Sequence, residues 1–305
     1  MIQSLAQLFV QVLAPILLMT GAGYLLQSRL HLDVRSISRL VFYILAPCLI
    51  YTSILTTEFE RDIVGRMVAF AALNMLLMGL AAYALGRKWG YKGALGSAFV
   101  VTNILLNNGN YGLPLNLFAF GEQGFGYAVV LFMFNSLVGS AISIYLMARS
   151  HDGADGRLAL RRTLGAPVIW AMTLGLLSRI TGVAPQGSLM DMLQMAGRAA
   201  IPVFLVVLGM SLTTTKARLG ANPITRLTFL RMLGGPALAI PLALVIGLTG
   251  VAYAVAVMQA SMPTAVNSIV LSNEFEAAPD FVAGAVFFTT LASVITLPAL
   301  LFWLQ

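Results

Sequence analysis

Two stretches of the sequence place amide side chains, glycine and proline inside otherwise apolar runs. The first covers residues 103–115 and contains four asparagines and Pro114, and the second covers residues 259–268 and contains Gln259, Pro263 and Asn267. Proline removes a backbone donor and clashes with the carbonyl four residues earlier, so neither stretch should form a good continuous helix. Amide side chains can satisfy the backbone groups that such a break releases.

Each break predicts a short helix whose N-terminus, after Pro114 or Pro263, presents amides and a partial positive charge. Such an end is a favourable place for a carboxylate. The candidate substrate-binding residues are therefore Asn107, Asn108, Gly109, Asn110, Gly112, Pro114, Gln259, Met262, Pro263, Asn267 and Asn135.

A purely structural interpretation stays open, in which the prolines are packed kinks and the asparagines form hydrogen bonds between helices. The same two interpretations apply to other polar residues in apolar stretches. These are Asn135, Ser136, Ser211, Thr289, Thr290 and Ser293.

Catalytic and metal-binding sets are not expected. The single cysteine, Cys48, lies in an apolar run, and the two histidines, His31 and His151, lie in hydrophilic connections. A thiolate or histidine metal site and a histidine-dependent triad are therefore excluded, and no cofactor is implied. We expect no ionisable side chain in the middle of any span and assign Arg231 to a connection, so amides and dipoles must meet any substrate charge.

The composition indicates a bundle of helices in a lipid bilayer. Of the 305 residues, 59% are hydrophobic and 10% are charged, against ~25% charged in ordinary globular chains. A soluble enzyme, a disordered tail and a disulfide-stapled module are disfavoured. The net charge of +7 is spread over the connections, which also argues against a nucleic-acid partner. The apolar beginning of the chain predicts a retained first helix rather than a cleaved signal.

Ten apolar stretches are long enough to cross a ~30 Å hydrocarbon core. They cover residues 4–26, 36–56, 65–86, 92–119, 124–148, 164–182, 188–212, 224–248, 251–272 and 280–303. Fourteen of the 18 Lys and Arg residues fall in or beside the first, third, fifth and seventh connections. Because cytoplasmic connections are rich in these residues, both termini are predicted on the outer side. Asp33 is expected to cap the second helix.

The two halves of the chain repeat the same order of prolines. Pro15 precedes Gly23 by eight residues, as Pro167 precedes Gly175, and Pro114 in the fourth stretch corresponds to Pro263 in the ninth. Five spans per repeat is an odd number, so the second copy must enter the membrane from the other side. The expected fold is an all-α membrane protein of two inverted five-helix repeats, residues 1–148 and 164–305, joined by a cytoplasmic connection at 149–163, with broken helices 4 and 9.

Three motifs carry a resemblance to a known family. They are Asn107 followed by Gly112-Leu113-Pro114-Leu115, then Gln259-Ala260-Ser261-Met262-Pro263, and near the end Ser293-Val294-Ile295-Thr296-Leu297-Pro298. The chain resembles the auxin efflux carrier family of membrane transporters, which includes plant auxin exporters and bacterial members linked to malonate and other organic acids. The resemblance is to the bacterial members and implies a multi-pass protein of the inner (plasma) membrane.

The resemblance further implies spans 1, 2, 6 and 7 as a scaffold and spans 3–5 and 8–10 as a moving transport domain. Spans 4 and 9 would cross at Pro114 and Pro263, and Asn107 would contact the substrate carboxylate. A homodimer through the scaffold helices is implied as well.

These observations predict a secondary carrier of a small organic anion, such as malonate or an auxin-like acid, that works by an elevator or rocking movement. The main alternative is a sodium-coupled symporter of the bile acid type, although stretches 4 and 9 contain no acidic sodium ligand. A membrane receptor or sensor would need an output domain that the short loops do not offer. A membrane-embedded enzyme would need a converging catalytic set. Channel-like conduction through the crossing stays open.

Overall fold

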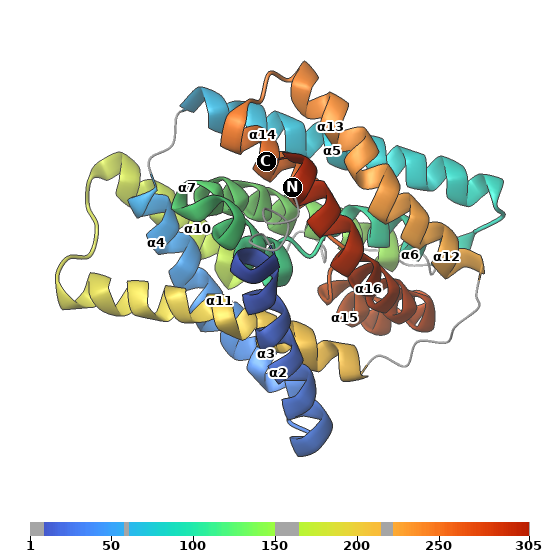
Figure 1. Cartoon of the computed structure of the whole chain (residues 1–305), viewed down its shortest axis with the longest axis horizontal. Coiled ribbons are helices and arrows are strands. Elements are labelled where there is room, and N and C mark those ends of the chain that lie inside the picture. Colours follow the sequence, from blue (N-terminus) through green and yellow to red (C-terminus); the bar gives the residue numbers. More distant parts are fainter. Residues whose placement is uncertain (1–8, 58–60, 150–164, 215–221, 305) are drawn as a thin grey trace.

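The chain folds almost entirely into helices (Figure 1). The computed structural model describes residues 9–57, 61–149, 165–214 and 222–304. The predicted connection at 149–163 lies, apart from Arg149, outside the described residues.

The helices of the first half follow the predicted apolar stretches. They are η1 (Phe9–Leu13), α2 (Ala14–Leu30), α3 (Val34–Leu40), η2 (Val41–Leu45), α4 (Ala46–Thr56), α5 (Arg61–Lys88), α6 (Gly93–Ile104), η3 (Asn108–Gly112), α7 (Leu113–Phe134), η4 (Asn135–Gly139) and α8 (Ser140–Ala148). The elements named η are single π-helical turns. Gly121 bends α7 with a φ of 65°, a conformation that glycine adopts at no steric cost. This bend separates the predicted fourth and fifth stretches.

The second half of the chain is helical as well. Its helices are α10 (Pro167–Thr181), α11 (Ser188–Thr214), α12 (Asn222–Phe229), η5 (Leu230–Gly234), α13 (Gly235–Val245), α14 (Gly250–Ala260), α15 (Asn267–Glu274) and α16 (Pro279–Leu304). Seven of the described helical stretches are long and apolar enough to cross a membrane, and three apolar helices are shorter. The short ones are α6, α10 and α14.

Four of the π-helical turns share one cause. Each of η1, η2, η3 and η5 stands directly before a helix whose second residue is proline. The proline ring lacks an amide donor and collides with the carbonyl four residues earlier, so the preceding turn widens. The chain thus stays helical through Pro15, Pro47, Pro114 and Pro236.

Asp33 caps α3 as expected. Its carboxylate accepts hydrogen bonds from the Arg35 amide at 3.0 Å and from the Ser36 hydroxyl at 2.6 Å. These bonds, with that of Ser36 the stronger, lower the pKa of the Asp33 carboxyl.

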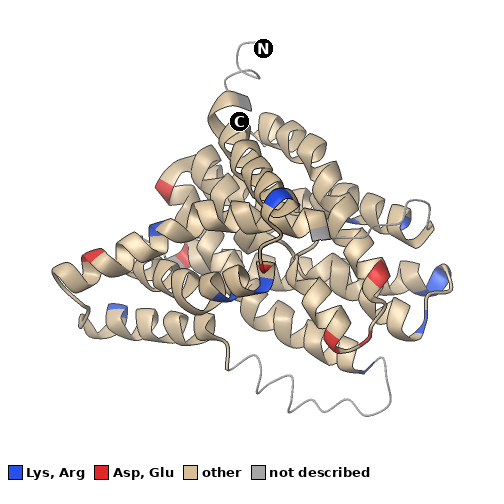
Figure 2. Cartoon of the chain, turned by 90° about the horizontal axis from the view of Figure 1, so that it is seen from below, with Lys and Arg blue, Asp and Glu red and all other residues tan. Residues whose placement is uncertain are grey.

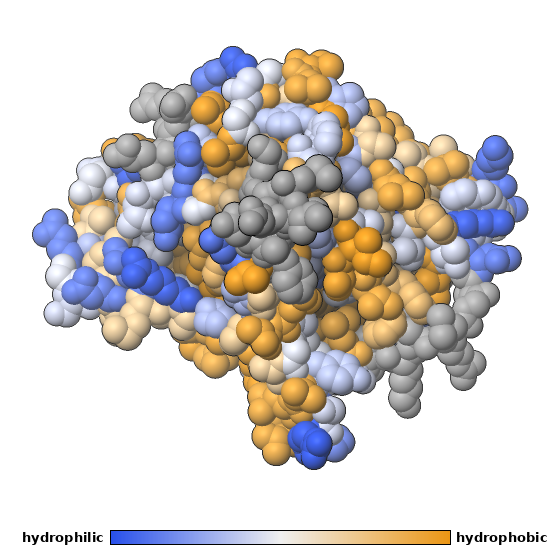
Figure 3. Space-filling view, in the orientation of Figure 1, coloured by the Kyte–Doolittle hydropathy of each residue, from blue (hydrophilic) through white to orange (hydrophobic). Residues whose placement is uncertain are grey.

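The surface of the bundle is that of a membrane protein. Figure 2 shows long helical stretches without a charged residue, and Figure 3 shows apolar side chains over much of the visible face. Ile180 is 81% exposed and Val245 is 84% exposed. Large exposed apolar surfaces mark contact with lipid or protein, and with the helix lengths they indicate a multi-pass membrane protein.

The helices pack in two groups. In one, α2 packs along α11, and α4 packs against α10 and α11. In the other, α5 contacts α6, α7, α13 and α14, while α16 contacts α12, α15 and α6. Figure 1 shows α5 running beside α13, far from the place where α2 packs against α11.

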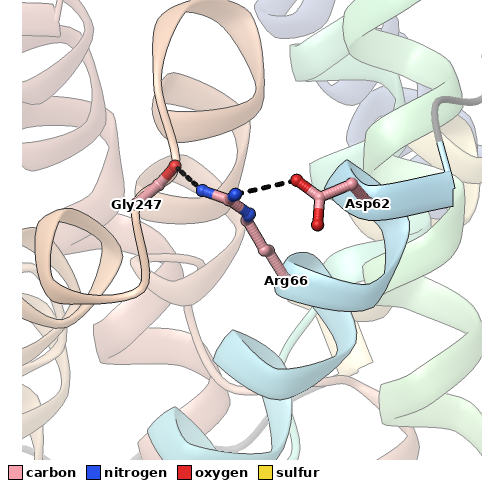
Figure 4. Close-up of polar contacts among 3 residues, drawn as sticks. All are labelled: Asp62, Arg66 and Gly247. Atoms are coloured by element: carbon pink, nitrogen blue, oxygen red, sulfur yellow. Dashed lines mark hydrogen bonds and ion pairs between the residues drawn. The ribbon is translucent and has the colours of Figure 1, made fainter.

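Arginine side chains tie helix ends together at the edges of this bundle. Arg66 pairs with Asp62 at 2.8 Å and donates to the Gly247 carbonyl at 2.9 Å (Figure 4). It thereby links the start of α5 to the turn between α13 and α14. Arg179, at the end of α10, donates to the Thr57 carbonyl at 2.6 Å, just after α4.

Two glycines allow α2 and α11 to approach closely. A Cβ atom added at Gly23 would collide with the Val206 carbonyl, and one added at Gly209 would collide with the Thr20 carbonyl. Small residues let membrane helices bring their backbones together and gain van der Waals contact.

Gly209→Val should therefore force α2 and α11 apart, whereas Gly21→Val, on the same pair of helices but with open space around its Cβ position, should not. Overpacking of this kind costs about 3 kcal/mol of unfolding free energy. The thermal unfolding midpoint in detergent should fall for Gly209→Val alone. Equal midpoints for the two variants would contradict the close approach.

Candidate functional site

The two interrupted helices meet at their breaks. One break separates α6 from η3, the other separates α14 from α15, and the two run antiparallel. The Asn107 amide donates to the Pro263 carbonyl at 2.9 Å, and the Ala265 amide donates to the Leu105 carbonyl at 2.9 Å. Each break thus provides the backbone partners that the other has lost. We call residues 105–107 and 263–265 the crossing.

The crossing includes Pro263 but not Pro114, which corrects the expectation from the family resemblance. Pro114 is the second residue of α7, seven positions beyond Asn107. Proline lacks an amide donor and has a bulky ring, and the wider π-helical turn η3 accommodates both. In this turn the Gly112 amide donates to the Asn107 carbonyl, five residues earlier, at 3.0 Å. The chain therefore breaks before η3 rather than at the proline.

The last carbonyls of α6 receive side-chain donors from the other break and from η4. The Thr264 hydroxyl donates to the Thr102 carbonyl at 2.8 Å, and the Asn135 side-chain nitrogen donates to the Ile104 carbonyl at 3.1 Å. A helix end leaves such carbonyls without intrahelical partners. Asn135 therefore forms the interhelical hydrogen bond that the structural interpretation proposed for it.

The carbonyl between these two, that of Asn103, binds Arg231. One guanidinium nitrogen donates to it at 2.8 Å, and another contacts the carbonyl of Ala260, the last residue of α14. Arg231 belongs to η5 and is fully buried. The expectations that it lies in a connection and that no ionisable side chain occupies a span are therefore wrong. The reason is that two helix C-termini, whose dipole ends are negative, compensate its charge.

At the other ends of the breaks, backbone amides are free. No acceptor within the described residues binds the amides of residues 108–110 or of residues 266 and 267. The side-chain nitrogen of Asn107 is buried without a partner as well. These are hydrogen-bond donors only, concentrated where two helical segments begin.

All of these donors except the amide of residue 108 belong to residues that line a cavity of about 200 Å³, a volume equal to about seven waters at liquid density. Its walls come from both groups of helices. The lining includes Asn107, Gly109, Asn110, Asn135, Ser136, Ser140, Ala265, Val266 and Asn267, and on the other side Phe42, Val168 and Phe204.

Five of the predicted residues line this cavity: Asn107, Gly109, Asn110, Asn135 and Asn267. Asn108 and Gln259 instead line a smaller cavity of about 30 Å³. Gly112 packs against the Gln259 side chain, and Met262 is buried against other apolar residues. The remaining two, Pro114 and Pro263, shape the backbone.

Other polar residues serve mainly between or along helices. The Thr289 hydroxyl of α16 accepts a hydrogen bond at 3.1 Å from the Thr264 amide, in the break between α14 and α15. Ser211 and Ser293 donate to carbonyls of their own helices. No group of three or more His, Cys, Asp or Glu residues in the described part of the chain could hold a metal ion.

Sequence reasoning missed Arg231 and the aromatic and aliphatic wall of the cavity. Arg231 had one signal, since it lies seven residues inside the apolar stretch at 224–248 and precedes Gly234 and Gly235. Phe42, Val168 and Phe204 carried no such signal, because their immediate neighbours in the sequence are apolar or small.

Comparison with known proteins gives one family and two relatives. A family described as "Membrane transport protein" matches residues 8–155 and 154–302. An uncharacterized transporter of Methanothermobacter thermautotrophicus is 27% identical over 270 residues, with 87% of each chain covered. The uncharacterized transporter MJ1031 of Methanocaldococcus jannaschii is 24% identical over 271 residues, with 86% of each chain covered.

Proposed function

The chain belongs to the membrane transport protein family, that of the auxin efflux carriers, and on that premise we propose that it is a secondary carrier of a small organic anion. The family and both relatives are transporters rather than enzymes. The substrate class is a carboxylate such as malonate or an auxin-like acid, bound in the cavity beside the crossing.

The observation that carries this proposal is the set of donors without acceptors. The buried side-chain nitrogen of Asn107 and the free amides of residues 109, 110, 266 and 267 surround one cavity. An ionised carboxylate accepts hydrogen bonds and donates none, so it complements this lining. The two helix N-termini add a partial positive charge.

The cavity size limits the substrate. About 200 Å³ holds a small carboxylate with a few waters. Phe42, Val168 and Phe204 supply an apolar wall, so the site favours an anion with a short apolar part over a highly hydroxylated one.

Two spaces at different heights support alternating access. Besides the cavity at the crossing, a wider space of about 780 Å³ separates α4 and α11 from α7. Along α7 and α8, the wide space lies at residues 117–127 and the cavity lies at residues 132–140. Along α11, the wide space includes Gln194 and Arg198, whereas the cavity includes Phe204. Both lie between the same groups of helices.

We therefore propose that α2, α4, α10 and α11 form a scaffold and that the helices of spans 3–5 and 8–10 move against it as an elevator or a rocking body. Residues 1–148 and 164–305 would be the two inverted five-helix repeats. The antiparallel pairing of the two breaks supports this arrangement, since equivalent segments of inverted repeats must run in opposite directions. Both termini would lie on the outer side, and a dimer would form through the scaffold.

Binding to Asn107 is tested by replacing it. Asn107→Ala should weaken carboxylate affinity at least about tenfold, because a hydrogen bond to a charged group contributes about 1.5–3 kcal/mol. Calorimetric titration of the purified protein measures this affinity. Asn273→Ala, which removes the same side chain from an exposed position on α15, is the control. Wild-type affinity in Asn107→Ala would refute the site.

The two spaces are tested by chemical accessibility. In a Cys48→Ser background, Thr56→Cys lies in the wide space and Ser140→Cys lies in the cavity. A membrane-impermeant maleimide should label Thr56→Cys from outside the cell and Ser140→Cys only after permeabilisation. Labelling of both from the same side would contradict the proposed alternation and topology.

A further inference from the structure

The fully buried Arg231 lies where the C-terminal ends of α6 and α14 converge. Its guanidinium donates to the Asn103 carbonyl at 2.8 Å and contacts the Ala260 carbonyl. Gly235, one turn later, makes this possible, because a Cβ atom there would collide with the guanidinium. One positive charge is therefore buried between two helix C-termini, whose dipole ends are negative.

Beside Arg231, the cavity of about 30 Å³ is lined by five buried amide residues, of which Asn135 donates to the Ile104 carbonyl. The side-chain oxygens of Asn74, Asn103, Asn108 and Gln259 have no hydrogen-bond partner. Each of these residues is more than nine-tenths buried, and no carboxylate lines the cavity. Carriers of broken-helix architecture coordinate a coupling cation with backbone carbonyls at unwound helix ends, and side-chain amide oxygens such as these four are cation ligands as well.

A mobile cation cannot bind easily next to Arg231. Asn103 and Ala260 line the small cavity and also bind the guanidinium. Two like charges this close repel strongly in a buried environment. The cavity is large enough for water, which can donate to the four oxygens without adding charge.

We propose that Arg231 is a resident cation of the crossing and takes the place that a transported sodium ion would otherwise occupy. The consequence for transport rests on the proposed function: the anion moves without a coupled cation. The guanidinium travels with the helices that bind the substrate. It offsets the charge of a bound monocarboxylate whenever that site moves.

The test compares Arg231→Ala with wild type and with Arg226→Ala, a control on the same span whose arginine stacks on Trp89 instead. Thermal unfolding of the detergent-solubilised full chain is measured in sodium chloride and in choline chloride at equal ionic strength. We expect the midpoints of wild type and Arg226→Ala to be the same in both salts. Arg231→Ala should unfold several degrees lower in choline and should recover with sodium in a saturable manner.

Adding Asn74→Ala to Arg231→Ala should abolish the sodium effect, since it removes one of the oxygens. If Arg231→Ala does not fold, the same unfolding measurement is made on Arg231→Lys and Arg231→Met. The lysine variant keeps the charge, so its midpoint should be the same with and without sodium. The midpoint of the methionine variant should rise with sodium. Sodium-dependent stability of wild type or of Arg231→Lys would overturn the proposal, as would indifference of both neutral variants.

Flux in liposomes adds an independent readout. Wild-type uptake of a carboxylate should be equal with and without sodium, whereas Arg231→Ala should require it. A sodium requirement in wild type would overturn the resident-cation role. Absence of carboxylate flux in every condition would refute the proposed function, while the unfolding midpoints would still decide the role of Arg231.

Discussion

The structure depends on the pairing of two chain breaks in a setting where water cannot replace a lost backbone hydrogen bond. Within a bilayer, each unsatisfied amide or carbonyl costs several kcal/mol, which normally restricts spanning segments to continuous helices. Here the amide of Asn107 reaches the carbonyl of Pro263, and the amide of Ala265 reaches that of Leu105. Neither break could exist without the other.

This pairing places hydrogen-bond donors and backbone carbonyl acceptors of the crossing in different positions. The beginnings of η3 and α15 leave amides and the Asn107 side chain as donors around one cavity. The ends of α6 and α14 leave carbonyls, and their partners are the donors of Thr264, Asn135 and Arg231. Donors are therefore left open where a carboxylate would bind, whereas these backbone carbonyls are paired. The separation follows directly from the opposite polarity of the two ends of a helix.

The sequence predicted the parts of this arrangement that arise from local chemistry. The asparagines, glycines and prolines of residues 103–115 and 259–268 correctly marked both interrupted segments, and Asp33 was recognised as a cap from its place before an apolar run. Tertiary pairing was less accessible. The break was predicted at Pro114, because a proline can be recognised in the sequence. It lies at residues 105–107 instead, because the β-like bridge between Leu106 and Thr264 has no local sequence signal.

Arg231 shows the same limit for charge. A hydropathy pattern predicts that an arginine within a span belongs to a connection, since burial of an unpaired cation is costly. Two carbonyl ends from helices 128 and 29 residues away in the chain make that burial possible, and no local pattern encodes them. The wall formed by Phe42, Val168 and Phe204 was equally hidden, because the residues directly before and after each of them are apolar or small as well.

The central claim is that amide donors at the crossing bind a carboxylate for transport. The most direct measurement is the electrical current that a panel of mono- and dicarboxylates, including malonate and indole acetate, induces in liposomes containing the protein. The account predicts a saturable current for at least one carboxylate, lost in Asn107→Ala and kept in Asn273→Ala. A carboxylate current of the same size in Asn107→Ala, or no current and no binding for any carboxylate, would contradict it.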